Sequence, residues 1–307
     1  MLPTAIDSVL PQLGEEDELL IIDNASTDET AEVLNRYTDA KVRVVRNPKA
    51  VNLYENHNCC IEHARGEWVI IVHSDEKCVP GAIAAFGEAL KGATERTALL
   101  LPEFDRPCMQ EMRGRPWYQQ RLAFPYTFAM SLSGIGAPSV VGFRKQALEE
   151  IGGFGTEREL SYFGDHHCYM RLSDLKWEMF LIGSPVEKRD CGEHQASWKM
   201  RRSGESDRSL TYAMERIAKL PSWSAVIDFL EKDIAAWPGA RILVVMRLVA
   251  LSGKRRDFKR LRRACKNVRG VFGFRNMLVP RLASRIGPRN FMRTIGWWRW
   301  MQQVMGR

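Results

Sequence analysis

Short apolar runs alternate with amphipathic segments along the first 150 residues. The runs at residues 18–22, 41–46, 67–72 and 97–101 have the length and apolar character of strands. Between them, residues 31–37, 52–64 and 80–90 carry apolar side chains at helical spacing. Strands that alternate with helices indicate crossover connections. The pattern predicts an α/β fold with a mainly parallel sheet flanked by helices.

Local signals predict where several helices begin and end. Ser26 is followed by Glu29, the spacing of a capping box, so we expect a helix to begin at Ser26. Pro80 opens another helix, and Gly152 and Gly153 close one over residues 144–151. Residues 163–172 predict a further helix. Residues 103–140 are rich in proline and are expected to form a long irregular loop region.

The second part of the chain differs from the first in charge. Residues 1–198 contain 20 Lys and Arg and 30 Asp and Glu, a net charge of −10, whereas residues 199–307 contain 25 and 7, a net charge of +18. From Ser206 onward, amphipathic helical patterns follow one another, separated by prolines. We therefore predict a domain over residues 1–200 and a basic, mostly helical extension over residues 201–307.

Composition excludes several classes of protein. With 45% hydrophobic and 27% charged residues, the 307-residue chain is neither disordered nor a small disulfide scaffold. It has no apolar stretch of about 18 residues that could span a membrane, and no secretion signal follows Met1. Seven cysteines without a C-x-x-C pair indicate free thiols in a reducing compartment, so we expect a cytoplasmic protein.

Polar side chains directly follow two predicted strands. Asp23 and Asn24 end the first strand, and His73 and Asp75 end the third. Ligands of open parallel sheets collect at the carboxyl ends of strands, so these residues are candidates for binding. The alternatives are an Asx turn at Asp23 and a helix cap or a loop turn at Asp75.

Four segments carry a resemblance to a known family, the family 2 glycosyltransferases with a GT-A fold. Residues 21–28 (IIDNASTD) resemble the family's VVDNGSTD segment, and residues 71–76 (IVHSDE) are similar to its D-x-D-D metal segment. Residues 141–154 (VGFRKQALEEIGGF) resemble an acceptor-side segment, and residues 163–172 (FGDHHCYMRL) a segment that carries the catalytic base. The resemblance covers about residues 1–200 and implies a GT-A-like catalytic domain there.

The resemblance implies roles for individual residues. It assigns a divalent cation, Mn2+ or Mg2+, to Asp75 and His73. His194 begins a segment (HQAS) similar to the family's late H-x-x-S segment, which implies that it completes the cation site or contacts the diphosphate; the alternative for His194 is an ordinary polar contact. His73 stands where the family has an Asp, and imidazole suits Mn2+ better than Mg2+. Asp23 is expected to accept a hydrogen bond from the nucleotide base. The full set implied to bind the nucleotide-sugar is Asp23, Asn24, Ser26, Asp28, Asn58, Ser74 and Arg171.

Asp165 is the general base that the resemblance implies. Inverting transfer needs one carboxylate to take the proton of the acceptor hydroxyl as its oxygen attacks the sugar. The neighbours depart from the family pattern, with Gly164 and His167 in place of acidic residues. The alternative for Asp165 is a helix N-cap. Another alternative is a zinc site formed by His167, Cys168, Cys191 and His194.

The predicted function is transfer of a sugar from a nucleotide-sugar, most simply a UDP-sugar, to a glycan or lipid-linked glycan, as in polysaccharide biosynthesis. One rival is a degenerate, non-catalytic transferase domain that docks to membranes or partner proteins. A second rival is a polyanion-binding protein in which the acidic part is a scaffold.

Two features lie outside the four segments. The family's first strand, which ends in P-x-Y-N, has no counterpart, so we expect the sheet to lack a central strand unless the natural chain starts upstream or another segment fills the gap. The second feature is the tail, where cations over residues 254–269 precede a mixture of Trp and Arg over residues 289–301. It predicts peripheral binding to an anionic membrane, or else a helical bundle with a solvated charged face. No nucleic-acid partner is expected.

Overall fold

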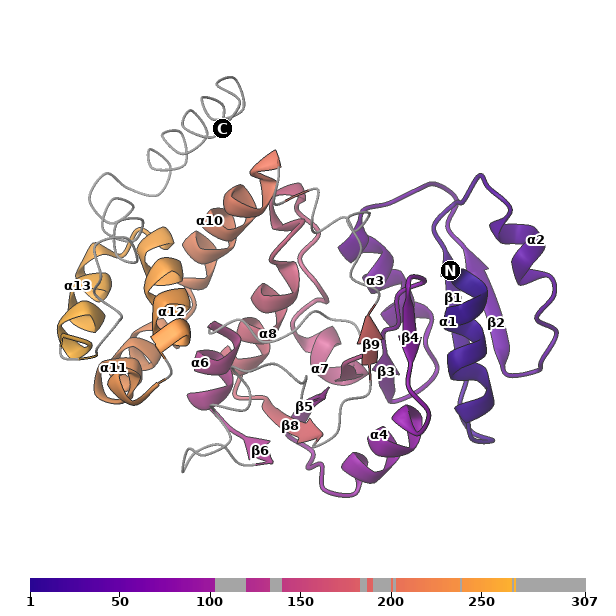
Figure 1. The fold of residues 1–307 in the computed structure, drawn as a ribbon, viewed down its shortest axis with the longest axis horizontal. Coiled ribbons are helices and arrows are strands. Elements are labelled where there is room, and N and C mark those ends of the chain that lie inside the picture. Colours follow the sequence, from indigo (N-terminus) through magenta and orange to yellow (C-terminus); the bar gives the residue numbers. More distant parts are fainter. Residues whose placement is uncertain are drawn as a thin grey trace. The chain divides into compact units, whose positions relative to one another are not determined.

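The computed structural model describes residues 1–102, 120–132, 140–182, 187–189, 200, 203–237, 239–266 and 268 (Figure 1). These residues divide into two compact units. The first is drawn from Met1–Phe124, Gly136–Arg158 and Leu175–Gly192. The second is drawn from Pro125–Ile135, Glu159–Asp174 and the residues after 192. Predicted site residues before residue 80 lie in the first unit, and Asp165 and Arg171 lie in the second. The predicted division at residue 200 stays a prediction.

The described residues of the first unit form three sheets. A two-stranded parallel sheet joins β1 (Leu19–Asp23) to β2 (Val42–Arg46). A short antiparallel ladder joins β4 (Glu76–Cys78) to β9 (Glu187–Arg189). The third sheet has the order β3-β7-β5-β8-β6, with strands at Trp68–Ile70, Gly142–Arg144, Thr97–Pro102, Glu178–Ile182 and Arg121–Leu122.

The α/β fold class is confirmed, but the prediction of a mainly parallel sheet is wrong for the described strands. In the five-stranded sheet only β5 and β8 run parallel. β7 is antiparallel to both β3 and β5, and β6 is antiparallel to β8. An apolar run has the same composition in either direction, so the hydrophobic pattern locates a strand without giving its direction.

Burial differs sharply between the sheets. Every residue of β5 is buried, and Leu100 packs in a core with Phe86, Val140 and Phe180. In β1 only Asp23 is buried, and all three residues of β3 are half-buried. No described strand is hydrogen-bonded to the second edge of β1 or of β3. Among the described residues, therefore, no strand joins these two sheets, and the expected lack of a central strand stays a prediction.

Five α-helices and a 3-10 turn, η1 (Leu10–Gln12), are described in the first unit. The N-cap of α3 is Asn52, whose side chain accepts the N–H groups of Tyr54 and Glu55, while Glu55 accepts the N–H of Asn52 in return. This capping box fixes the start of α3. The helices are α1 (Leu2–Val9), α2 (Thr30–Leu34), α3 (Leu53–His63), α4 (Ala82–Leu90) and α7 (Lys145–Glu150). A second 3-10 turn, η2 (Arg158–Leu160), begins at the last residue of the segment Gly136–Arg158.

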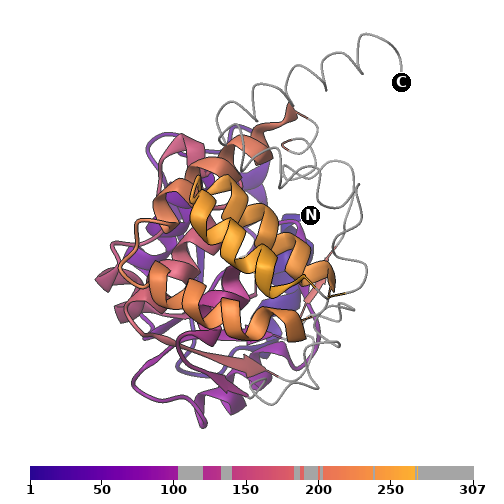
Figure 2. The same ribbon diagram turned by 90° about the vertical axis from the view of Figure 1, so that its left-hand side faces the viewer.

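The second unit is helical throughout its described part. It contains α6 (Tyr126–Leu132), α8 (Gly164–Asp174), α10 (Glu205–Ile217), α11 (Trp223–Asp233), a 3-10 turn (Ile234–Ala236), α12 (Gly239–Leu251) and α13 (Arg255–Ala264). α12 and α13 lie side by side (Figure 2). None of the described helices combines the length and the apolar character needed to cross a bilayer.

The prediction that residues 103–140 form an irregular loop region is wrong for those of its residues that the structure describes. Residues 121–122 form β6, and residues 126–132 form α6, whose side chains from Thr127 to Leu132 are all buried. A helix that is buried on every side has no polar stripe, so its sequence lacks the periodicity that marks an amphipathic helix. Pro125, interpreted as a loop signal, directly precedes α6, where a proline is tolerated. Residues 103–119 and 133–139 lie outside the described residues.

Candidate functional site

Asp23 ends β1 with its carboxylate turned into the loop that follows. The carboxylate accepts the N–H of Ser26 at 2.9 Å and forms an ion pair with Arg46 at the end of β2. Arg46 also donates to the carbonyl of Ser26 at 2.7 Å. Burial alone would raise the pKa of Asp23, but the bonds from Ser26 and Arg46 outweigh it and hold the pKa below its ordinary value. The ionised carboxylate of Asp23 is therefore integral to this loop.

Asn24 ties the same loop to the segment before α3. Its carbonyl oxygen accepts the N–H of Val51 at 2.9 Å and an amide proton of Asn47 at 3.0 Å, and its amide donates to Val51 O at 2.9 Å. Asn47 also donates to Asn56 at 3.0 Å. The next residue, Ala25, has a φ of 56°, in the left-handed region that disfavours residues with a Cβ. The loop is thus held in a conformation that its own sequence does not favour.

The prediction that Ser26 caps the following helix is wrong. α2 begins at Thr30, and Ser26 belongs to the turn closed by Asp23. Asp28 instead accepts the N–H of Thr30 at 3.1 Å and its hydroxyl at 2.5 Å, and these bonds lower the pKa of this exposed carboxylate. The Asx turn at Asp23 takes the N–H of Ser26 and so moves the start of the helix four residues along the chain.

Asn58 joins α3 to the segment after α7. Its amide donates to the carbonyl of Phe154 at 3.0 Å, and its carbonyl oxygen accepts the N–H of Phe154 at 2.8 Å. A Cβ at Gly153, whose φ is 74°, would stand 2.5 Å from the Asn58 oxygen, so only glycine allows this approach. Both ends of the Asn58 side chain are thus engaged by backbone.

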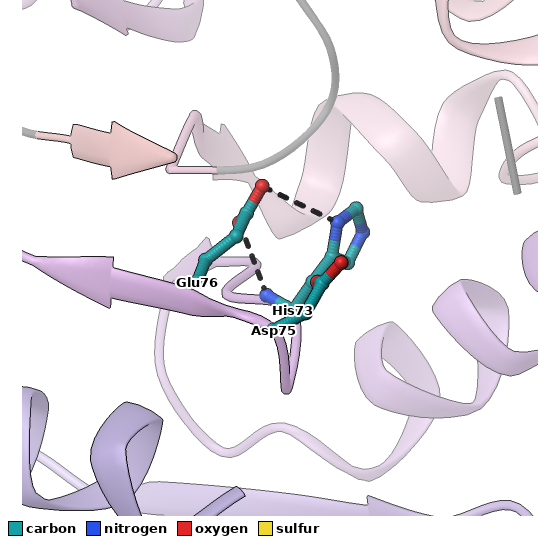
Figure 3. Close-up of side chains that lie close together, drawn as sticks. All are labelled: His73, Asp75 and Glu76. Carbon is teal, nitrogen blue, oxygen red and sulfur yellow. Dashed lines mark hydrogen bonds and ion pairs between the residues drawn. The ribbon is translucent and has the colours of Figure 1, made fainter. Parts of the chain in front are cut away.

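A cluster of three potential metal ligands lies after β3 (Figure 3). The ligand atoms of His73, Asp75 and Glu76 all lie within 4.8 Å of one another. Glu76 is buried and begins β4; it accepts the N–H of His73 at 3.3 Å, and its second oxygen lies 3.7 Å from His73 Nδ1. Asp75 is exposed and makes no hydrogen bond or ion pair with any described residue. Ser74 is exposed between them.

The donor set suits a divalent cation. Two carboxylates and one imidazole within reach of a single point match the oxygen and nitrogen ligands that Mn2+ accepts, and Mg2+ would use the carboxylates. Glu76 was not among the predicted ligands, although the fourth position of the D-x-D-D pattern points to it. His194, the remaining predicted ligand, lies outside the described residues, as does Cys191.

Behind His73 stands a second histidine that sequence reasoning missed. His57 of α3 is 2% exposed, and its Nε2 lies 3.1 Å from Nε2 of His73. The rings of Tyr54 and Phe154 pack edge-on against it. Burial first, and then the nearby His73, lower the pKa of His57 to about 3, so its ring is neutral at physiological pH. The signal in the sequence was the helical spacing that places His57 beside the buried Tyr54 and Ile61.

Asp165 and Arg171 lie at opposite ends of α8 in the second unit. Asp165 is buried in the first turn, and its carboxylate accepts the N–H of His166 at 2.8 Å. Because α8 begins at Gly164, Asp165 is inside the helix and is not its N-cap. The positive end of the helix dipole favours an ionised carboxylate there. Arg171 is half-buried in the last turn.

Two of the four candidate zinc ligands are described. His167 and Cys168 are both buried in α8. Burial raises the pKa of the Cys168 thiol strongly, which favours the protonated, non-ligating form in the metal-free protein. The two adjacent residues therefore resemble ordinary core residues of the helix.

Comparisons with known proteins place the first part of the chain in a family. The model of Glycosyl transferase family 2 matches residues 1–152. An uncharacterized protein of Mycobacterium tuberculosis (strain CDC 1551 / Oshkosh), MT1568, is 29% identical over 163 residues, 49% of this chain and 51% of the relative. The Escherichia coli UDP-Glc:alpha-D-GlcNAc-diphosphoundecaprenol beta-1,3-glucosyltransferase WfaP is 27% identical over 79 residues, 26% of this chain and 32% of the relative. The chain thus spans about half or less of the length of these curated relatives.

Solved structures share the fold. S. aureus TarS 1-349 in complex with UDP-GlcNAc superposes with a TM-score of 0.53 at 15% identity over 86% of each chain. The mannosyltransferase PcManGT from Pyrobaculum calidifontis, in complex with GDP-Man and Mn2+, has a TM-score of 0.51 at 16% identity over 92% of this chain and 84% of that one. Residues 1–152 of this chain therefore belong to glycosyl transferase family 2, and the chain has a GT-A fold.

Proposed function

We propose that this protein is an inverting, metal-dependent glycosyltransferase that moves a sugar from a nucleotide-sugar to a hydroxyl group. The observation that carries the proposal is the cluster of His73, Asp75 and Glu76 after β3, in a chain whose first 152 residues match the family. Such a cluster meets the requirement of a diphosphate leaving group, which needs a cation held by carboxylates.

The donor nucleotide binds at the loop after β1 in this proposal. Asp23, Asn24, Ser26 and Asp28 shape that loop, and Asp23 retains unused lone pairs that accept a base N–H beside Arg46. Asn58 and Arg171 remain candidates for contact with the donor, as does the exposed Ser74. UDP is the proposed nucleotide, since the WfaP name gives UDP-Glc and TarS was solved with UDP-GlcNAc.

Asp75, Glu76 and His73 would hold the cation, with His194 as a further ligand. Bound there, Mn2+ or Mg2+ supplies positive charge that stabilises the departing diphosphate. Mn2+ is the stronger proposal because His73 offers nitrogen where an all-oxygen set would favour Mg2+. PcManGT, a neighbour in fold, was solved with Mn2+.

Asp165 is the proposed base. Its carboxylate takes the proton of the acceptor hydroxyl while the acceptor oxygen attacks the anomeric carbon from the side opposite the diphosphate. The bond to the diphosphate breaks as the new glycosidic bond forms, so no covalent enzyme intermediate is needed. The position of Asp165 in the first turn of α8 supports its ionised, proton-accepting form.

Donor turnover tests the proposal. The purified protein is mixed with UDP-glucose, UDP-GlcNAc or GDP-mannose and Mn2+, and released nucleoside diphosphate is quantified with and without EDTA. We expect release with at least one donor, abolished by EDTA. Asp165→Asn is expected to keep donor binding while losing transfer to an acceptor. A protein that binds none of the donors, with or without Mn2+, contradicts the proposal and favours a non-catalytic docking module.

The acceptor is proposed to be a glycan or lipid-linked glycan at the cytoplasmic face of a membrane, which α13 contacts. Arg260 pairs with Asp228 and Glu231 of α11, and Phe258 and Leu261 are buried. The other cations are exposed and form no ion pair with the described residues, although Arg263 is near enough to Glu231 to help lower the pKa of that carboxylate: Lys254, Arg255, Arg256, Lys259, Arg262, Arg263 and Lys266. Each contributes about 1 kcal/mol near an anionic surface.

Vesicle binding tests the membrane contact. We expect the protein to sediment with phosphatidylglycerol vesicles and not with phosphatidylcholine vesicles, and to be released at high salt. The variant Arg255→Glu/Lys259→Glu/Arg262→Glu should lose this binding. Arg260 is left unchanged in the variant, so that α13 keeps its ion pairs with α11. Equal binding of the variant and the parent would contradict the contact, and salt-sensitive binding of nucleic acid alone would favour the polyanion-binding alternative.

A further inference from the structure

His57 is a buried imidazole that the proposed function leaves without a role. It lies in α3, 2% exposed, edge-on against the rings of Tyr54 and Phe154, which stack on each other. Its Nε2 is 3.1 Å from His73 Nε2, and its Nδ1 has no hydrogen-bond partner among the described residues. A buried polar atom without a hydrogen-bond partner lowers the stability of the fold, so His57 is a candidate for a functional role beside the cation site.

The geometry of His73 limits how it can bind a cation. Its Nδ1 faces Glu76, 3.7 Å from the carboxylate (Figure 3), and its Nε2 lies 3.1 Å from Nε2 of His57. A neutral imidazole that ligates through Nδ1 must carry its proton on Nε2. That proton needs an acceptor, and the described atom within hydrogen-bond distance is Nε2 of His57.

We propose that His57 is a positioning residue that accepts the Nε2–H of His73 and thereby turns the Nδ1 lone pair of His73 toward the cation. This inference rests on the proposed cation site. Metal-ligating histidines commonly donate their second ring N–H to a carboxylate or carbonyl; here a neutral imidazole takes that place. His57 then carries its own proton on the unpartnered Nδ1.

Two arrangements of the pair follow. With the cation bound, His73 donates and His57 accepts. Without it, the reverse arrangement leaves His57 Nδ1 as an unprotonated acceptor, and an orphaned buried acceptor is less costly than an orphaned buried N–H. In that arrangement the His73 proton sits on Nδ1 and faces the Glu76 carboxylate. Cation binding thus selects the donor and acceptor of one hydrogen bond, and His57 sets how strongly His73 participates.

The test is Mn2+ affinity, measured by calorimetry on the full chain without any sugar donor. His57→Phe keeps an aromatic ring against Tyr54 and Phe154 but has no acceptor, and we expect its Kd for Mn2+ to rise about 10- to 100-fold. His57→Gln offers a carbonyl acceptor and should recover most of the affinity. The preference for Mn2+ over Mg2+ should fall in the Phe variant, because the contribution of His73 is weakened.

Melting temperatures of both variants without metal show whether they fold. Asp75→Ala provides the reference for loss of the cation site itself. If Asp75→Ala weakens Mn2+ binding but a folded His57→Phe variant binds like the parent, the role of His57 is overturned while the site stands. If Asp75→Ala leaves binding unchanged, or the parent binds no Mn2+, the site and the inference both fail. Failure of His57→Gln to restore affinity also contradicts the inference.

Discussion

Asp23 and Asp75 occupy the same place in the sequence pattern but very different places in the structure. Each comes at or near the end of an apolar strand. Asp23 is 5% exposed and bonded to Ser26 and Arg46, so its charge is used within the fold. Asp75 is exposed, with no bond to any described residue, beside His73. The carboxylate of Asp23 is bonded within the fold, whereas that of Asp75 makes no such bond and is available to a ligand.

The difference shows how to separate structural from functional acidic residues. A carboxylate that is desolvated and paired stabilises the fold, and its removal leaves the partner charge unsatisfied. A carboxylate held near others without compensating cations is unfavourable on its own, and this cost is relieved when a cation binds. The comparison therefore predicts that Asp75 affects activity without affecting stability, whereas Asp23 affects stability in addition to its proposed contact with the nucleotide base. Asn58 is expected to affect stability as well.

Asp75→Ala should have the largest effect. We expect sugar transfer to fall at least about a hundredfold, because cation stabilisation of the leaving group contributes several kcal/mol. The melting temperature without metal should be unchanged, since Asp75 makes no bond to the described residues. Steady-state transfer rates and thermal melting are the measurements. Glu62→Ala, which removes an exposed carboxylate of α3 that belongs to no proposed site, is the matched control and should retain activity.

Asp23→Asn should lower the free energy of unfolding by about 2 kcal/mol at pH 7, since the charged bond to Arg46 is lost. The folded-state pKa of Asp23 lies below its ordinary value of 3.8, so the charge stabilises the fold above that pH. As the pH falls through the lowered pKa, this stabilisation disappears. Urea unfolding at several pH values should therefore show parent and variant converging below pH 3.8. A constant difference at every pH would contradict this role.

Asn58→Ala sharpens the distinction between binding and stability. It removes both hydrogen bonds to Phe154 and should cost about 1–3 kcal/mol of unfolding free energy, measured by urea denaturation. Asn56→Ala is the matched comparison. Asn56 lies two residues earlier in α3 and its side chain has a single hydrogen bond, from Asn47, so this substitution should lower the free energy of unfolding by less. An Asn58→Ala protein with parental stability but weakened UDP binding would instead support the predicted contact with the nucleotide.

Ala25→Gly should have the smallest effect and the opposite sign. Relief of the left-handed backbone at Ala25 is worth about 1 kcal/mol, and the added freedom of glycine in the unfolded chain offsets about half of it. We expect a gain of about 0.5 kcal/mol and a slightly higher melting temperature. Ala31→Gly, at an exposed position of α2 where φ is helical, should destabilise the protein and is the control. If both substitutions destabilise the protein, the backbone strain proposed at Ala25 is contradicted.

The sequence predicted where most elements lie but not how strands pair. The apolar runs located β1, β2, β3 and β5 because burial requires them, whereas the antiparallel direction of β7 depends on contacts that no local pattern records. The buried α6 was missed for want of a polar face, and β8 was not anticipated. A helix start depends on which groups bind the backbone N–H donors of the segment. The N–H of Ser26 donates to the side chain of Asp23, so Ser26 belongs to a turn and does not cap the helix.

The candidate site was predictable in part for a similar reason. A family pattern located His73 and Asp75, since it records chemistry at fixed spacing. Glu76 was missed although it holds the fourth position of that pattern, and β4 turns it back onto His73. Helical spacing indicates that His57 is buried, but only the fold shows that α3 brings it beside His73. A contact between residues of different elements, such as His57 and His73, is not recorded in the spacing along the chain.

Binding of UDP with and without a cation tests the central claim most directly. Calorimetry of UDP titrated into the parent protein should give clear binding in Mn2+ and a large loss of affinity in EDTA, with Asp75→Ala resembling the EDTA condition even when Mn2+ is present. Equal affinity for UDP in Mn2+ and EDTA, or parental affinity in Asp75→Ala, would contradict a cation site formed by His73, Asp75 and Glu76.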